Sequence, residues 1–288
     1  MVSDCYATFS KSIDFIEANL KEPITVTAIA GQVANYSLYH FVRLFRILTG
    51  ETPGSYLKKR RLSEAAREIV DSNRSILDVA VAYQFGSHES FTRSFKKHFG
   101  VTPGELRRRL IFLHLTSRAM IVPVLLDPII TQTPHLDHQS NLLLAGLAYH
   151  GDNAHFELVD LWRSLMEQRH LLPNQRSLRE AYGLWRYPNN FQVDRNFDYL
   201  AGVAMENLAD LPPRFASADL KPCLYARFEH PGSLEHIRST YIYIYGEWLP
   251  QSQYRLAGNY DLEFYDERFT GPDREDSVLN ILVPVTTK

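Results

Sequence analysis

Basic, polar and aromatic side chains recur in two sets that lie fifty residues apart in the sequence. The first set is Tyr39, Val42, Arg43 and Arg46, and the second is His88, Glu89, Thr92, Arg93 and Lys96. Arginine can form two hydrogen bonds with guanine in the major groove of DNA, and lysines and further arginines suit phosphates. One charged helix face alone is usually only solvated. Two such faces at equivalent positions favour DNA binding over that alternative.

An internal repeat places these sets at equivalent positions. When residues 26–54 are aligned with residues 76–104, nine positions carry the same residue type. They are Ala30, Ser37, Phe41, Arg43, Phe45, Gly50, Thr52, Pro53 and Gly54 in the first copy and Ala80, Ser87, Phe91, Arg93, Phe95, Gly100, Thr102, Pro103 and Gly104 in the second. The repeat indicates one supersecondary unit that occurs twice.

Each copy is predicted to form a helix, a tight break and a second helix, which is the helix-turn-helix arrangement. The second helices run from a capping serine, Ser37 or Ser87, to about residues 48 and 99. Their apolar residues recur at helical spacing and should form the core. These core residues are Phe41, Leu44, Phe45 and Leu48 in one copy and Phe91 and Phe95 in the other. An amphipathic helix over residues 10–20 should support the first unit.

Residues 56–70 read as a single helix between the two units. At 1.5 Å per residue it spans roughly 22 Å, so it can hold two reading helices about one DNA turn apart, roughly 34 Å. Near its start it carries four consecutive basic residues, Lys58, Lys59, Arg60 and Arg61, which we expect to contact phosphates. The alternative is a solvated basic turn.

Length and composition are those of a soluble two-domain protein. The chain has 288 residues, of which 45% are hydrophobic and 22% charged. No run approaches the roughly 18 apolar residues of a membrane span, and the first residues lack the basic and apolar regions of a secretory signal. We therefore expect a cytoplasmic protein without membrane association.

Charge is divided unevenly along the chain. Residues 1–110 carry 16 Lys and Arg against 11 Asp and Glu, a net charge of +5, whereas the remainder carries 15 against 22, a net charge of −7. This division indicates that only the first part meets a polyanion. Cys5 and Cys223 have no second thiol or histidine at metal-binding spacing, so we expect reduced structural thiols, no metal site and no cofactor.

Strand-like and helix-like segments alternate after residue 141. Residues 111–141 contain Pro123, Pro128 and Pro134 and read as a connector whose apolar part either packs on a domain or forms a first strand. Strands are expected at 142–149, 180–187, 199–205, 222–229, 260–265 and 278–285, with helices at 155–171 and 234–249. Residues 240–246 have the composition of a strand. We nevertheless predict a helix there, because a second repeat requires it.

The second repeat is fainter than the first. AYHG at 148–151 and LLPN at 171–174 match FEHPG at 228–232 and WLPQ at 248–251, and YGLWRY at 182–187 overlies YDLEFY at 260–265. These matches imply two strand-helix-strand-strand units around a pseudo-twofold axis.

The motif ILDVAVAYQFGSHESFTRSFKKHFGVTPGELRR, residues 76–108, resembles the signature of the AraC/XylS family. The resemblance implies a sequence-specific transcription regulator in which one chain places two helices in adjacent major grooves and works with RNA polymerase. It places base contacts at Tyr39, Val42 and Arg43 in the first helix, where several relatives have Trp for Tyr39 and Gln for Val42. In the second helix it places them at His88, Glu89, Thr92 and Arg93. The full set of candidate DNA-binding residues is Ser37, Tyr39, His40, Val42, Arg43, Arg46, Lys58, Arg61, Ser87, His88, Glu89, Thr92, Arg93, Lys96 and Lys97.

EHPGSLEHI, EWLPQS and YDLEFYDERF, within residues 229–269, resemble the GyrI-like effector-binding domain. This resemblance implies a groove between the two halves of the domain that binds a small organic molecule, often cationic and aromatic.

Glu263 has the chemistry to bind such a molecule. Strand alternation puts Leu262 and Phe264 on one face, which we expect beneath the helices, and leaves Glu263 to the groove. A carboxylate among aromatic rings suits a cation. The equivalent position in the other half is Trp185. Further candidates for the ligand site are Tyr149, Trp162, Tyr225, Trp248 and Tyr265. The alternatives are core packing for each ring and an exposed or salt-bridged carboxylate for Glu263.

The sequence thus predicts a multi-domain protein with an all-α double helix-turn-helix domain at 1–110, a linker at 111–141 and an α+β domain at 142–288. We predict a monomeric, non-enzymatic transcription regulator that binds double-stranded DNA and a small effector. One alternative is a hydrolase that uses Glu263 as acid or base, although no Ser-His-Asp, Cys-His or metal constellation accompanies it. The other alternative is a C-terminal module that docks another protein.

Overall fold

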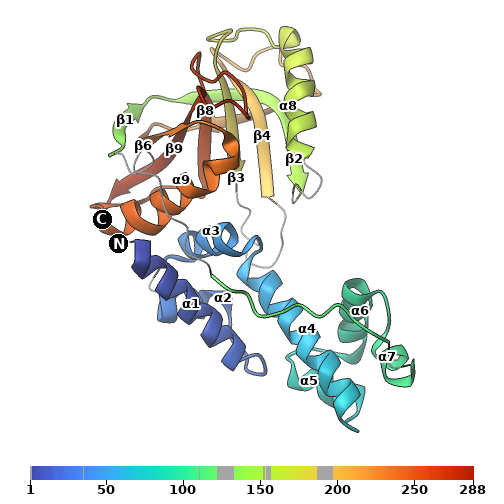
Figure 1. The fold of residues 1–288 in the computed structure, drawn as a ribbon. Coiled ribbons are helices and arrows are strands. Elements are labelled where there is room, and N and C mark those ends of the chain that lie inside the picture. The colour runs from blue at the N-terminus through green and yellow to red at the C-terminus, as the bar shows by residue number, and fades with distance from the viewer. Residues whose placement is uncertain are drawn as a thin grey trace. The chain divides into compact units, whose positions relative to one another are not determined.

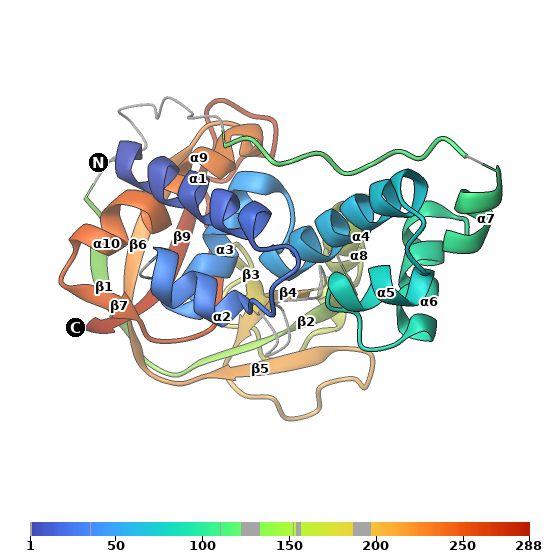
Figure 2. The same cartoon turned by 90° about the horizontal axis from the view of Figure 1, so that it is seen from below.

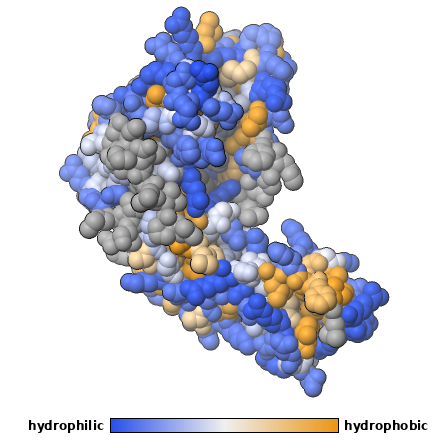
Figure 3. Space-filling model, in the orientation of Figure 1, coloured by the Kyte–Doolittle hydropathy of each residue, from blue (hydrophilic) through white to orange (hydrophobic). Residues whose placement is uncertain are grey.

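The structure is a computed structural model that describes residues 2–34, 36–109, 111–121, 133–151, 153, 157–186 and 197–288. The described residues form two compact units, one within residues 3–121 and one within residues 133–288. None of the described helices has both the length and the apolar character needed to cross a membrane. Hydrophilic residues cover most of the coloured surface of both units in Figure 3, with hydrophobic residues in smaller patches.

The first unit is all-helical (Figure 1). Its elements are α1 (Val2–Ala18), α2 (Val26–Ala28) with a π-helical continuation (Ile29–Ala34), α3 (Leu38–Thr49), α4 (Pro53–Asp71), α5 (Ile76–Ala82), α6 (His88–Phe99) and α7 (Pro103–Arg109). The segment α2 to Ala34 pairs with α3, and α5 pairs with α6. Both predicted helix-turn-helix units are therefore confirmed, and α4 connects them.

Equivalent caps begin and end the two second helices. The Ser37 hydroxyl accepts the His40 N–H at 3.4 Å, and the Ser87 hydroxyl accepts the Ser90 N–H at 3.1 Å. Each helix then ends at a glycine in the left-handed conformation, Gly50 at φ 80° and Gly100 at φ 77°. Glycine adopts this conformation without the steric cost that a Cβ atom brings. The sequence repeat thus reproduces the residues that begin and end the helix, a serine N-cap and a left-handed glycine.

Aromatic rings form the core of each helix-turn-helix unit. Phe9 of α1 stacks on Phe41 at 5.3 Å between ring centroids, and Phe41 contacts Phe45 at 5.7 Å. In the second helix-turn-helix unit Phe91 contacts Phe95 at 5.5 Å between ring centroids, and both side chains are fully buried. The apolar faces predicted for α3 and α6 are confirmed.

The second unit is built on a nine-stranded antiparallel sheet in the order β1-β6-β9-β8-β3-β4-β2-β5, with β7 paired to β9. Its strands are β1 (His135–Gln139), β2 (Leu142–Gly151), β3 (Ala181–Arg186), β4 (Phe197–Met205), β5 (Ala216–Leu220), β6 (Cys223–Pro231), β7 (Tyr254–Leu256), β8 (Tyr260–Tyr265) and β9 (Val278–Thr287). Strand β1 falls in the stretch read as a connector, where a first strand was one of two alternatives, and it pairs with β6.

Two helical segments accompany the sheet (Figure 1). One is α8 (Glu157–Gln168), which continues as a 3₁₀ turn (Arg169–Leu171). The other comprises a 3₁₀ turn (Leu234–His236), α9 (Ile237–Tyr243), a π-helical turn (Ile244–Trp248) and α10 (Leu249–Gln251). Residues 240–246 are therefore helical, as predicted. Tyr241 through Tyr245 are all buried, so packing on several sides outweighs their strand propensity.

The two halves of this unit are arranged symmetrically. Strands β3 and β8 pair antiparallel at the centre, with Leu184 opposite Leu262, and the equivalent strands β4 and β9, then β2 and β6, follow outward. This order confirms the two predicted strand-helix-strand-strand units. Leu184 and Leu262 lie next to the pseudo-twofold axis, so Trp185 and Glu263 occupy equivalent positions.

The prediction that Leu262 and Phe264 lie beneath the helices is wrong. Tyr241 of α9 and Trp162 of α8 contact residues on the opposite face, the face of Glu263. Leu262 instead packs in a cluster that joins Leu142 of β2 to Tyr225 of β6, strands far apart in the sheet order. The sheet must curl to bring them together, so it buries this face against itself and needs no helix over it.

Candidate functional sites

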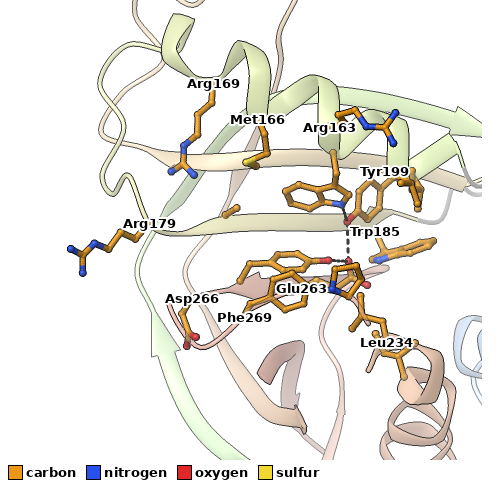
Figure 4. Close-up of a pocket in the computed structure, with 17 residues that line it drawn as sticks. Arg163, Met166, Arg169, Arg179, Trp185, Tyr199, Leu234, Glu263, Asp266 and Phe269 are labelled. Carbon is orange, nitrogen blue, oxygen red and sulfur yellow. Dashed lines mark hydrogen bonds between the residues drawn. The ribbon is translucent and has the colours of Figure 1, made fainter. Parts of the chain in front are cut away.

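A cavity of about 540 Å³ lies on the helix-bearing face of the curled sheet (Figure 4). Residues of α8 form one wall, and Leu234, Ile237 and the loop that follows β8 form the other. Strands β3, β4 and β8 form the floor, where Trp185, Tyr199 and Glu263 are found. Cavities of about 300–1,000 Å³ hold drug-sized molecules.

Tyrosine hydroxyls hold the carboxylate of Glu263 at this floor. Tyr199 and Tyr265 each donate to Oε2 at 2.9 Å, and Tyr241 donates to Oε1 at 3.5 Å. Glu263 is only 6% exposed. Hydrogen bonds of this kind offset the cost of burying a carboxylate in apolar surroundings.

The hydroxyl groups of Tyr199 and Tyr265 stay protonated over the working pH range. Burial raises the pKa of both well above the usual tyrosine value, and the charge of Glu263 raises each pKa further. Both side chains therefore act as hydrogen-bond donors to the carboxylate. Tyr199 also accepts a hydrogen bond, because the indole N–H of Trp162 on α8 donates to its oxygen at 3.0 Å.

Aromatic rings surround the carboxylate. Trp162 meets Tyr265 edge-on at 4.8 Å between centroids, and Trp185 meets Tyr199 edge-on at 4.9 Å. Phe269 closes against Tyr265 at 4.7 Å. Such rings attract cations through their negative faces and bind apolar groups by contact.

Arginines at the rim of the cavity are engaged with neighbouring groups. Arg163 pairs with Asp160 at 2.7 Å. Arg169 donates to the carbonyls of Ser177 and Glu180 at 2.8 and 2.9 Å. Arg163 and Arg169 are thus held by neighbouring groups, and a carboxylate lies at the floor. The arrangement suits an apolar cation.

Four of the seven side chains predicted for the ligand site line this cavity, namely Trp162, Trp185, Glu263 and Tyr265. The structure places the other three elsewhere. Tyr149 lines a separate cavity of about 340 Å³. Tyr225 lies on the opposite face, 2.7 Å from Tyr260 between hydroxyl oxygens, and Trp248 stacks on Tyr254 at 6.1 Å.

Sequence reasoning did not find Tyr199 or Tyr241. Tyr199 lies directly opposite Trp185 in the β3–β4 pair, so the register of that hairpin would have identified it. Tyr241 lies in the segment whose strand-like composition hid its helical geometry. Among the residues that the structure describes, no group of three or more His, Cys, Asp and Glu side chains is placed to hold a metal ion.

Helix α6 presents the polar face that the sequence predicts. His88, Glu89, Arg93, Lys96 and Lys97 are exposed, and Thr92 is half-buried. Ser87 serves as the N-cap of this helix. These side chains on one helix can thus meet bases and phosphates in a major groove.

Helix α3 differs from α6 in exposure. Tyr39, His40, Val42 and Arg43 are buried in the structure, and Arg46 is half-buried. The exposed polar face that the sequence predicts is therefore seen on α6, and for α3 it stays a prediction.

The four basic residues of α4 do not share one role. Lys58 is exposed, whereas Lys59 pairs with Glu51 at 2.7 Å. Arg60 is buried and pairs with Glu17 and Glu64, each at 2.8 Å. The expectation that all four meet phosphates is thus wrong for Arg60.

Arg61 is also used within the fold. Its guanidinium donates to the carbonyls of Leu20 and Glu22 at 2.8 and 2.6 Å, which fixes the chain beyond α1 against α4. Of the two α4 residues proposed for DNA, Lys58 and Arg61, only Lys58 has an exposed side chain.

Residues 111–121 form a strap along α4 (Figure 2). The Thr116 N–H donates to the Ser63 hydroxyl at 3.0 Å, and the Thr116 carbonyl accepts from Arg60. The Ala119 N–H donates to the Tyr56 hydroxyl at 3.2 Å. Burial alone would raise the pKa of Glu17, yet hydrogen bonds from Arg60 and Tyr56 keep it below its usual value. The strap, α4 and α1 therefore share one polar network.

Comparison with known proteins places each unit separately. Residues 31–109 match the profile of a helix-turn-helix domain, and residues 133–286, more than half of the chain, match that of the GyrI-like small molecule binding domain.

Among curated proteins, the chain is 42% identical over 97 residues to the probable transcription factor PqrA of Proteus vulgaris. The matched region covers 33% of this chain and 79% of that protein. It is 37% identical over 98 residues to the HTH-type transcriptional activator AarP of Providencia stuartii, covering 34% and 72%. It is 40% identical over 94 residues to the right origin-binding protein of Escherichia coli K12, covering 33% and 32%.

Solved structures also resemble each part. SAV2435 bound to tetraphenylphosphonium is similar to 54% of this chain over 94% of its own length, at 17% identity and a TM-score of 0.44. An AraC-type transcriptional regulator from Chromobacterium violaceum is similar to 36% of this chain over 91% of its length, at 29% identity and a TM-score of 0.34.

Proposed function

The chain belongs to the AraC-type helix-turn-helix family through its first unit and to the GyrI-like small-molecule-binding family through its second, and on that premise we propose that it is a one-component transcription regulator controlled by an aromatic cation. The relatives matched by the first unit are named as transcription factors and activators. The second unit supplies the cavity for the effector.

One observation carries the choice of effector: the buried carboxylate of Glu263 lies at the floor of a cavity walled by aromatic rings. A cation in this cavity is attracted by the carboxylate and by the faces of the rings. An apolar aromatic body would fill the remaining volume and gain about 25 cal/mol for each Å² removed from water. A neutral ligand of the same shape would gain only the second contribution.

For DNA we propose that the two units read adjacent major grooves from a single chain. The exposed side chains of α6 support this for the second helix-turn-helix unit. For α3, whose Tyr39 and Arg43 are buried in the structure, the proposal rests on its equivalence to α6 in the repeat. Because one chain carries both units, we propose that a monomer suffices and that its output passes through RNA polymerase.

Effector binding must favour one state of the regulator over another if it is to change transcription. We propose that the effector domain begins at about residue 133, where the GyrI-like match begins. Strand β1 then belongs to the effector domain.

Calorimetry with a matched pair of ligands tests the effector proposal. An aryl trimethylammonium should bind, and its neutral tert-butyl isostere should bind at least tenfold more weakly. Glu263→Gln should remove this difference because it removes the charge while it keeps the shape. Glu206→Gln, an exposed carboxylate outside the cavity lining, serves as the control. A Glu263→Gln variant that keeps the full cation affinity and the preference over the neutral isostere would contradict the proposal.

Binding to the protein's own upstream DNA and to scrambled duplex tests the first unit. We expect a preference for the upstream DNA and an affinity that falls steeply with salt, since phosphate contacts release counterions. Arg93→Ala should reduce the preference by about 1–3 kcal/mol if Arg93 contacts a base. Equal binding to both duplexes at every salt concentration would contradict the regulator role.

We propose a binding role for Glu263 rather than a catalytic one. Oε2 already accepts two tyrosine hydroxyls at 2.9 Å, which weakens it as a base for water. Turnover of an ester or epoxide that is lost in Glu263→Gln would favour the hydrolase alternative instead.

A further inference from the structure

Gly183 leaves open the space through which Tyr199 reaches Glu263. Gly183 on β3 lies directly opposite Glu263 on β8 in the central strand pair. A Cβ atom at this position would lie 2.1 Å from the hydroxyl oxygen of Tyr199 and 2.7 Å from Oε2 of Glu263. Neither contact is possible without displacement, so any side chain at position 183 would push Tyr199 and Glu263 apart.

The hydrogen bond that crosses this space belongs to a relay with a fixed direction. A tyrosine hydroxyl has one hydrogen, and Tyr199 donates it to Oε2 of Glu263 at 2.9 Å. The oxygen of Tyr199 then accepts the indole N–H of Trp162 at 3.0 Å. The relay links α8, β4 and β8, and the dashed lines in Figure 4 mark its bonds.

The relay also limits what the carboxylate can do for a ligand. A carboxylate has about four acceptor positions. Two positions on Oε2 receive Tyr199 and Tyr265, and Oε1 receives a longer bond from Tyr241 at 3.5 Å. A ligand with N–H donors would have to displace these tyrosines to hydrogen-bond with Oε2. A cation without donors is attracted by the charge alone and displaces none of them.

We propose that Gly183, Tyr199 and Trp162 are positioning residues that make this site select onium cations without N–H groups over primary ammonium ions of the same skeleton. The proposal rests on the proposed function, since it assumes that a cation binds at Glu263. It adds the ligand class and the residues that set it. A primary ammonium could reach only the remaining acceptor position on Oε1, so at least two of its three N–H groups would lack acceptors among the aromatic walls, which costs binding free energy.

The test compares the affinities of naphthylmethyl-trimethylammonium and naphthylmethylammonium, measured by calorimetry on the full chain. The wild-type protein should prefer the trimethylammonium by at least tenfold. Tyr199→Phe keeps the ring but removes a donor to Oε2, so the preference should fall about tenfold, mainly through tighter binding of the primary ammonium. Gly183→Ala should shift the preference in the same direction, and Trp162→Phe should do so to a smaller extent.

Tyr182→Phe is the matched control. Tyr182 is adjacent to Gly183, but its ring stacks on Phe264 on the opposite face of the sheet, so its loss should leave the preference unchanged. If Tyr199→Phe weakens both ligands equally, its role is structural only and the proposal is overturned. No change in either affinity overturns it as well. Failure of the proposed function has a different signature: Glu263→Gln would then leave trimethylammonium binding intact.

Discussion

At the scale of single residues, charge alone did not show which basic side chains of α4 are exposed. Lys58 and Arg61 lie three residues apart on α4, yet the guanidinium of Arg61 is half-buried and donates to two carbonyls. Burial lowers the pKa of Arg61 without neutralising it. A run of four basic residues in sequence thus divides into an exposed charge, a surface ion pair and two structural arginines.

Separate substitutions of Lys58 and Arg61 should distinguish an effect on DNA binding from an effect on stability. Lys58→Gln should reduce the slope of log K against log salt by about 0.9, because one phosphate contact is lost. Arg61→Gln should leave that slope unchanged and reduce the free energy of unfolding by about 1–2 kcal/mol through its lost hydrogen bonds to carbonyls. DNA titrations at several salt concentrations and urea unfolding measure the two effects. The reverse pattern would show that Arg61 is the phosphate contact.

His230 makes the second unit sensitive to acid. It is fully buried, with Nδ1 2.7 Å from the Thr240 hydroxyl and Nε2 3.0 Å from the Ser233 carbonyl. Burial lowers its pKa, although the Ser233 carbonyl opposes this shift. As the pH falls, the unfolded chain therefore binds a proton before the folded chain does, and stability is lost below the unfolded pKa of about 6.5.

We predict that the free energy of unfolding of the second unit falls by up to about 1.4 kcal/mol for each pH unit below 6.5, until His230 is protonated in the folded state as well. His230→Gln should be less stable at pH 8 but should lose this part of the pH dependence. His236→Gln, at an exposed position in the same motif, is the control. Thermal unfolding between pH 8 and 5 measures the effect. An unchanged pH profile in His230→Gln would rule out His230 as its source.

At the scale of elements, the strap is the main addition to the sequence-based picture. A proline-containing stretch without periodicity gives no sign of where it docks. In the structure, residues 116–119 donate two backbone N–H groups to side chains of α4, and Arg60 donates to the Thr116 carbonyl. Of these side chains, Arg60 was predicted to contact phosphates, because sequence spacing shows which residues share a face but not what packs there.

The strap should protect backbone amides that lie outside regular secondary structure. We expect slow hydrogen exchange at Thr116 and Ala119 in the full chain. Ser63→Ala should accelerate exchange at Thr116, since its buried acceptor is lost, and should cost about 1–3 kcal/mol. Arg118→Ala, which removes an exposed ion pair with Asp14, should change stability by less than about 1 kcal/mol. Exchange at the rate of an unfolded peptide in the wild-type protein would show that the strap does not dock.

Sequence patterns predicted most of the elements but not which face of the sheet the helices cover. Alternation along β8 separated Leu262 from Glu263 correctly, because side chains on a strand point to alternate faces. It gave no information on which face the helices cover. That choice depends on the curl of the sheet, which joins β2 to β6 through contacts such as Leu142 with the cluster around Tyr225. Long-range closure of this kind leaves no local pattern.

At the scale of the whole molecule, the chain consists of two duplicated units with opposite net charge. Each duplication was visible in the sequence, and each appears in the structure as two equivalent sets of elements. The three tryptophans, Trp162, Trp185 and Trp248, all belong to the second unit. Intrinsic tryptophan fluorescence therefore reports on the effector domain alone.

This separation gives a direct measure of effector binding in the intact protein. A cation at 100 times its dissociation constant should stabilise the folded effector domain by about 2.7 kcal/mol and raise the midpoint of the fluorescence-detected thermal transition. The neutral isostere at the same concentration should raise it less. In Glu263→Gln the two ligands should give equal shifts. A midpoint that does not respond to any cation would contradict the proposed ligand class.

The pseudo-twofold axis beside Leu184 and Leu262 places Trp185 and Glu263 at matching positions in the two halves of one cavity. Had both halves kept a carboxylate, two buried negative charges would repel each other, and had both kept an indole, the cavity would have no charge at these positions. Because the two residues differ, one half of the symmetric framework presents a carboxylate to the cavity and the other presents an indole ring. A guest with one charged and one aromatic end therefore has a single preferred orientation in the cavity, and reversing it would bury its charge against carbon.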